Sequence, residues 1–120
     1  QVEVNAQATY IEAQSSPSNG RFVFAYTVTI ENNGTLAAQL LHRYWKITDG
    51  EGGVREVHGD GVVGEQPTIV PGDEFTYTSG AILETAIGTM EGYFEMVASD
   101  GEIFKAKIPL FTLLNPGALH

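Results

Sequence analysis

The 120-residue chain contains no cysteine. Disulfide bonds, thiolate metal sites and cysteine nucleophiles are therefore excluded, and a reducing cytoplasm is the compartment we expect. No apolar run approaches the roughly 20 residues that span a bilayer, and we find no charged and then apolar leader of the kind that directs secretion. We expect a soluble cytoplasmic protein without a membrane partner.

Basic residues are scarce, because the chain has 6 Lys and Arg but 15 Asp and Glu, and its formal net charge is -9. No Lys or Arg lies between Arg55 and Lys105, a span that is rich in Asp and Glu. Proteins that bind nucleic acids place cations against the phosphates, so the sequence argues against a nucleic acid partner. A basic protein surface or a cation is the partner that the charge favours.

The 3.6-residue period of a helix is also absent, and apolar residues recur instead at every second position. The run from Phe22 to Ile30 is the clearest example. A period of two is typical of half-buried strands, and clusters of Gly, Asn, Asp, Ser and Pro separate the runs. The sequence thus predicts an all-β antiparallel sandwich, in one domain over residues 1–120. The predicted strands are 2–10, 21–31, 40–48, 54–58, 73–79, 93–98, 103–108 and 110–114.

The alternation also predicts which side chains point inward. In the third strand we expect Leu41, Trp45 and Ile47 to face the core. Pro109 lacks the N–H that a ladder needs and is expected to end a strand, and the segment 80–91, with no clear period, is expected to be irregular. The predicted core includes Phe22, Phe24, Tyr26, Val28, Ile30, Trp45, Phe94, Met96 and Phe104.

The glycine stretch, Gly59 to Pro67, contains Gly59, Gly61 and Gly64 in the spacing G-x-G-x-x-G. In a dinucleotide-binding motif, a helix that follows the third glycine holds the pyrophosphate at its N-terminus. Pro67 leaves no room for such a helix, and no Lys or Arg follows before Lys105. We therefore interpret the glycines as structural, providing a positive φ or a close approach of strands. The β-branched valines between them are expected to avoid a positive φ.

His58 and Asp60 are candidate metal ligands, since a two-residue spacing on a strand places both side chains on one face. A third ligand is not evident, because His42 and His120 are distant in the sequence and only the fold could bring them near. The alternative is an exposed histidine and a turn-forming aspartate. We expect divalent ions to bind only weakly, to scattered carboxylates.

Arg43 lies two residues before Trp45 and therefore on the same strand face, which is otherwise apolar. A buried guanidinium without a partner would be costly, so we expect Arg43 to pair with a carboxylate or to reach the rim of the sheet. The alternative is that Arg43 is a hot spot in the binding of a protein partner. No catalytic pattern is evident, because Ser79 has no base near it in the sequence, and Asp73 and Glu74 point apart.

Several segments of the sequence resemble the ApaG family, in the same order and over nearly the whole chain. They are Phe24–Asn32, Leu40–Asp49, Gly59–Pro67, Phe75–Gly80 and Ile108–Phe111, with Pro116 and Leu119–His120 after them. The chain is most similar to the stand-alone bacterial members. One departure is that Ala86 follows Thr85, where the family often has proline.

The resemblance implies a fibronectin type III-like, immunoglobulin-like β-sandwich, in agreement with the alternation. A similar domain occurs in some F-box proteins and in a DNA polymerase delta-interacting protein, where it is thought of as a protein-interaction module. We therefore predict a non-enzymatic interaction module that has no cofactor and binds a protein partner of unknown identity. A homodimer is compatible with this prediction. Two alternatives remain. One is a protein that binds or responds to divalent cobalt or magnesium, with which the family has been associated, and the other is a nucleotide or pyrophosphate binder that uses the glycine motif.

Overall fold

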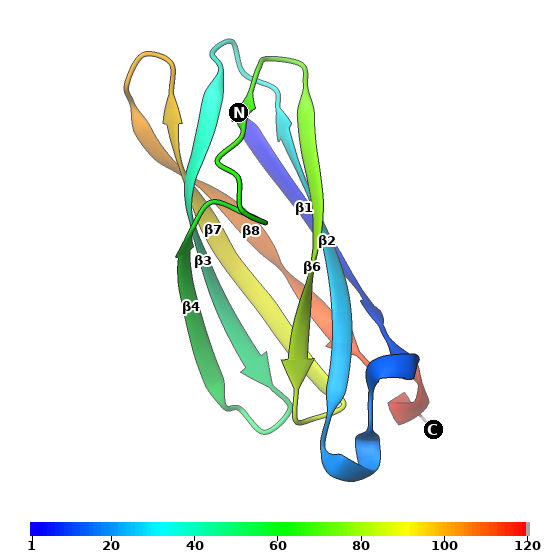
Figure 1. Ribbon diagram of the computed structural model, residues 1–120. Helices are drawn as coiled ribbons and strands as arrows, with labels where there is room; N and C mark the ends of the chain where they lie inside the picture. Colours follow the sequence, from blue (N-terminus) through cyan, green and yellow to red (C-terminus); the bar gives the residue numbers. More distant parts are fainter. Residues whose placement is uncertain (120) are drawn as a thin grey trace.

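The computed structural model describes residues 1–119, so His120 lies outside the described residues. Its strands are β1 (Val2–Tyr10), β2 (Phe22–Asn32), β3 (Ala38–Asp49), β4 (Val54–Asp60), β5 (Thr68–Ile69), β6 (Glu74–Leu83), β7 (Ile87–Ala98) and β8 (Ile103–Leu114). Short 3-10 helices occur at η1 (Glu12–Gln14), η2 (Pro17–Asn19) and η3 (Pro116–Leu119). The predicted all-β fold is confirmed (Figure 1). Within the described residues, no helix is long and apolar enough to cross a membrane.

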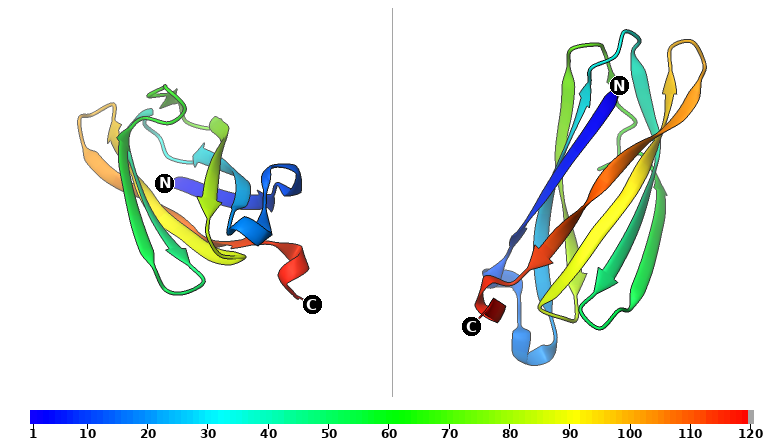
Figure 2. Two further views of the ribbon diagram at one scale, coloured as in Figure 1. Left: turned by 60° about the horizontal axis from the view of Figure 1, so that its bottom comes forward. Right: turned by 180° about the vertical axis from the view of Figure 1, so that it is seen from behind.

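The strands form two antiparallel sheets that pack face to face (Figure 2). The three-stranded sheet has the order β1-β2-β6, and the five-stranded sheet has the order β4-β3-β7-β8, with β5 paired to β3. On one side of the sandwich, β1 lies against β8. On the other side lie β4 and β6, the opposite edge strands of the two sheets (Figure 1).

The core lies between the sheets and contains the side chains that alternation predicted. Every predicted core residue is buried except Phe104, which is half-buried against the others. Trp45 is only 2% exposed. The rings of Tyr26 and Phe111 meet it edge-on, at centroid distances of 5.3 Å and 5.9 Å. Such edge-to-face contacts stabilise aromatic clusters beyond the area that they bury.

The prediction that Leu41 faces the core was wrong, because β3 contains a bulge. The pairing with β7 passes from Leu40–Met96 to His42–Glu95, so Leu41 is the extra residue. A bulge reverses the alternation on one side of it, and Leu40 is fully buried in place of Leu41. The Leu41 carbonyl instead accepts hydrogen bonds from the backbone N–H of Gly61 and from the Gln66 side chain.

The predicted break at Pro109 was also wrong, since β8 continues through it. The pairing with β7 passes from Met90–Phe111 to Gly92–Ile108, so Pro109 lies in a second bulge. Because β8 is an edge strand, a missing N–H is tolerated at this position.

The prediction that the segment 80–91 is irregular was wrong, because β6 extends to Leu83 and β7 begins at Ile87. Ala81 and Leu83 are buried on one side of a turn, and Met90 is buried on the other. Glycines in the segment hide this period of two in the sequence, because they provide no side chain to mark a face.

Candidate functional site

The glycine stretch folds back in a tight turn, and β5 rather than a helix follows it. Val62 and Glu65 exchange both backbone hydrogen bonds, at 2.8 Å and 2.9 Å. Between them, Val63 and Gly64 have φ values of 43° and 81°. Two positive φ values in a two-residue loop are typical of a type I′ turn. The expectation that the valines avoid a positive φ was wrong for Val63, because a two-residue turn of this type requires one at both positions.

Three backbone N–H groups in and beside this turn, those of Gly61, Val62 and Glu65, donate hydrogen bonds within the protein. Gly61 donates to the Leu41 carbonyl at 2.8 Å, and Val62 and Glu65 donate to each other. A phosphate cradle needs backbone N–H groups that point at the ligand. The geometry of the turn therefore gives no support to phosphate binding by the G-x-G-x-x-G spacing.

Arg43 lies opposite Gly59 in the pairing of β3 with β4. Its Nη1 donates hydrogen bonds to the carbonyl oxygens of Asp60, at 3.0 Å, and Gly61, at 2.9 Å. A Cβ at position 59 would lie 2.5 Å from the guanidinium carbon, so the guanidinium needs the space that glycine leaves. Arg43 thus holds the start of the glycine stretch through main-chain carbonyls. A carboxylate partner was one of the two arrangements that we expected, the other being a reach to the rim of the sheet.

His58 and Asp60 are both exposed on the outer face of the five-stranded sheet, but they have different neighbours. Asp60 lies opposite His42, which in turn lies opposite Glu95. Glu95 Oε1 is 2.8 Å from His42 Nδ1, whereas Asp60 Oδ1 is 3.5 Å from His42 Nε2. The two carboxylates therefore contact opposite nitrogens of one ring and do not converge on a point. The described residues contain no group of three or more His, Asp or Glu arranged to hold a metal ion.

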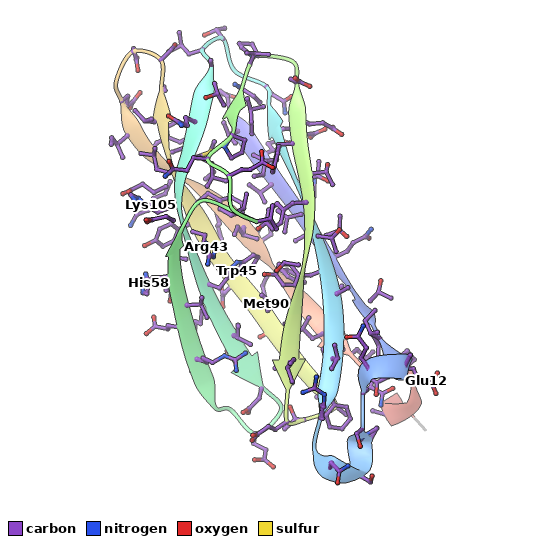
Figure 3. The ribbon with its side chains drawn as sticks, in the orientation of Figure 1. Glu12, Arg43, Trp45, His58, Met90 and Lys105 are labelled. Atoms are coloured by element: carbon purple, nitrogen blue, oxygen red, sulfur yellow. The ribbon has the colours of Figure 1, made fainter. Side chains whose placement is uncertain are left out.

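An aromatic band, formed by His58, Tyr44 and Tyr93, crosses the same outer face. These residues are cross-strand neighbours on β4, β3 and β7, and Tyr44 lies 4.9 Å from each of the other two rings. On β8, Lys105 Nζ lies 4.5 Å from the centre of the Tyr93 ring. Figure 3 shows His58 and Lys105 on the side of this sheet that faces away from Trp45. His58 is exposed and both tyrosines are half-buried, so the band is accessible to a partner.

Tyr44, at the centre of the band, is fixed at both ends of its side chain. Its hydroxyl donates a 2.6 Å hydrogen bond to Glu56 Oε2. This hydrogen bond is the main reason that the pKa of Tyr44 is raised to about 12, with smaller effects of burial and of the charge on Glu56. The phenol therefore keeps its proton, and with it this hydrogen bond, to a higher pH than a free tyrosine does.

The outer face of the three-stranded sheet is chemically different. Thr27 pairs with Thr78 at 2.9 Å between hydroxyl oxygens, and Thr29 pairs with Thr76 at 3.1 Å. These short side chains offer a partner little apolar area. The aromatic side chains that reach solvent on a sheet face are thus concentrated on the five-stranded sheet.

The sequence reasoning missed Tyr44, Tyr93 and Lys105 as site residues. The alternation in the sequence predicts that the Tyr44 side chain points outward, but its position beside Tyr93 depends on the register between β3 and β7. The same register brings His42 to Glu95. A single sequence contains no direct signal for cross-strand register.

Comparison with known proteins finds similarity over the whole length. The family model of the ApaG domain matches residues 12–98. Protein ApaG of Azoarcus sp. (strain BH72) is 59% identical over 119 residues, which are 99% of this chain and 94% of the relative. Protein ApaG of Enterobacter sp. (strain 638) is 57% identical over 117 residues, covering 98% and 94% of the two chains. A crystal structure of the ApaA protein from Bordetella pertussis superposes with a TM-score of 0.94 at 47% identity, covering 97% of this chain and 94% of that one.

Proposed function

The chain belongs to the ApaG domain family, and from this premise we propose that it is a non-enzymatic protein-interaction domain that binds its partner through the aromatic band. Neither the family description nor the names of these relatives is that of an enzyme family. The observation that carries the proposal is the contrast between the two outer faces. One presents stacked rings, and the other presents threonines.

Preorganised tyrosines suit a binding surface. Tyrosine is enriched at protein interfaces, where its ring contributes a large area and its hydroxyl a hydrogen bond. The rings of Tyr44 and Tyr93 are stacked with an interplanar angle of 30°, and Glu56 holds the hydroxyl of Tyr44. Because these side chains are already ordered, they lose less conformational entropy when a partner binds.

The charge around the band indicates the chemistry of the partner. The carboxylates of Glu56, Asp60 and Glu95 lie on the same outer face as the rings, together with Lys46, Lys105 and Lys107. Charged groups at the rim of an interface favour partners with the opposite charge at matching positions. We infer a protein partner with an apolar centre and a rim that carries both signs of charge, acting in the cytoplasm, to which the absence of cysteine is suited.

Affinity capture from a bacterial extract tests the proposal with three baits. They are the wild type, the double variant Tyr44→Ser/Tyr93→Ser, and the control Thr27→Ser/Thr78→Ser on the other sheet. Hot-spot residues contribute about 2 kcal/mol or more, which corresponds to about 30-fold in affinity. We expect the wild type and the control to retain the same protein, and the tyrosine variant, with its melting transition intact, to lose it.

Two results would contradict the proposal. One is equal recovery of that protein by all three baits. The other is the absence of any protein whose recovery depends on the tyrosines.

A further inference from the structure

A groove opens between the edge strands β4 and β6, on the side of the sandwich away from the β1–β8 contact. This β4–β6 groove contains a cavity of about 400 Å³ that reaches Tyr26, Trp45 and Met90. These three side chains are otherwise buried, at 7%, 2% and 1% exposure. Figure 3 shows Arg43, Trp45 and Met90 in this opening. Volumes of this size are typical of sites for small molecules.

The charge of the cavity is opposite to that of the protein as a whole. Arg43 and Arg55 line it, and no Asp or Glu does, although the chain has a formal net charge of -9. Within the described part of the chain, neither arginine forms a salt bridge with a carboxylate. The two side chains lie four residues apart along β4, since Arg43 pairs with Gly59 and Ile47 pairs with Arg55. A guanidinium without an acidic partner, beside an apolar surface, is suited to binding a carboxylate or sulfonate through two parallel N–H groups.

Polar groups in and beside the groove have unused hydrogen-bonding capacity. Trp45 Nε1 is buried and has no hydrogen-bond partner among the described residues. A buried indole N–H usually has one, because leaving it unpaired costs free energy. Arg55 reaches across from β4 to β6, where its Nη2 donates to the Ile82 carbonyl at 3.4 Å. A bond of that length is weak, so Arg55 is free to exchange it for a charged acceptor.

We propose that the β4–β6 groove binds an apolar organic anion. Its carboxylate or sulfonate pairs with Arg55, because the Arg43 guanidinium already donates to the Asp60 and Gly61 carbonyls. Its ring or chain packs against Trp45 and Met90 and, on the β6 side, against Ala81. A cavity of about 400 Å³ favours a compact ligand over a peptide that runs along both edge strands. This site is independent of the aromatic band, which lies on the other face of the five-stranded sheet.

The probe is 8-anilinonaphthalene-1-sulfonate, an apolar sulfonate that fluoresces when it leaves water. The chain contains one tryptophan, and because Trp45 lines the cavity, its own emission reports occupancy. At moderate salt we expect one probe per chain, with Trp45 quenching and probe fluorescence following the same binding curve. The neutral analogue N-phenyl-1-naphthylamine should bind about 10-fold more weakly or worse, since it cannot pair with the Arg55 guanidinium.

Arg55→Gln should weaken the probe by about 10-fold or more. Arg55 is exposed and is the variant of choice, because Arg43 also holds the glycine stretch. Lys107→Gln removes the same charge from the exposed outer side of β8 and should leave the affinity unchanged.

Three results would overturn the proposal. The first is equal affinity of the wild type and Arg55→Gln. The second is probe fluorescence without Trp45 quenching, which marks adventitious surface binding. The third is displacement of the probe by an extended peptide of alternating valine and glutamate more effectively than by 1-naphthoate, which would assign the groove to peptides.

Discussion

Gly61 and Gly64 both have a positive φ, but their surroundings differ. A Cβ at Gly61 would overlap the Glu65 carbonyl oxygen, whereas a Cβ at Gly64 would meet open space. Gly64→Ala should therefore cost about 1–2 kcal/mol through its backbone conformation alone. Gly61→Ala should cost more, because the turn must also move. Urea unfolding measures the free energy of unfolding of both variants. Equal decreases in the two variants would contradict this account of the turn.

The same proteins separate a structural role of the glycines from phosphate binding. A ligand that binds only the folded state raises its stability. Millimolar ATP or NAD should leave the melting temperature of the wild type and both variants unchanged. A rise in the wild type that both variants lack would assign the glycine stretch to nucleotide.

The ionisation of Tyr44 makes the stability of the protein depend on pH. Its pKa is raised from 10.0 to about 12, chiefly by its hydrogen bond to Glu56. The folded state therefore holds this proton more tightly than the unfolded state. The associated stability is present below pH 10.0 and is lost as the pH rises towards about 12.

Glu56→Gln removes the charged acceptor and should lower the pKa of Tyr44 towards 10.0. Phenolate absorbance follows the titration, and subtraction of the Tyr44→Phe curve isolates this residue from the other tyrosines. An identical Tyr44 titration in the wild type and Glu56→Gln would show that the hydrogen bond does not control the pKa.

At the scale of the elements, β2 is the centre of the three-stranded sheet and provides much of the core. Phe24 is 1% exposed and lies 5.4 Å from the ring of Tyr10. Phe24→Ala should destabilise the protein by about 3–5 kcal/mol through lost transfer energy and a residual cavity. Thr27→Ala, on the outer side of the same strand, should cost less than about 1 kcal/mol. Urea unfolding measures both, and similar losses would refute the assignment of faces.

The regular strands were predictable, and the bulges were not. In β2 an unbroken alternation marks the inner face from Phe22 to Ile30, and Met96 and Phe104, both in the predicted core, lie opposite each other in the β7–β8 pairing. A bulge adds one residue and changes the face of everything on one side of it. It leaves no pattern that a single sequence reveals, so Leu41 and Pro109 were misassigned.

The candidate site was predictable only within single strands. The two-residue spacing placed His58 and Asp60 on one face, as the structure has them. Contacts between strands, such as the stacking of Tyr44 on Tyr93, depend on register. Register follows from the packing of the whole sandwich and not from the spacing of any one strand.

For the molecule as a whole, the two outer faces are the basis of the functional proposal. The sandwich is elongated, with extents of 51 × 23 × 23 Å, so each sheet presents a long face to solvent. The face with stacked rings and carboxylates is suited to a protein partner, and the face with paired threonines is not. The central claim is therefore that contacts with the partner concentrate on the outer face of the five-stranded sheet.

Site-specific photocrosslinking in living cells tests this claim most directly. The photoreactive residue p-benzoylphenylalanine replaces Tyr44, at the centre of the aromatic band, or Thr29, on the outer face of the other sheet. The account predicts a crosslinked protein after irradiation with the probe at position 44 and none with the probe at position 29. A crosslink at position 29 alone, or none at either position, would contradict it.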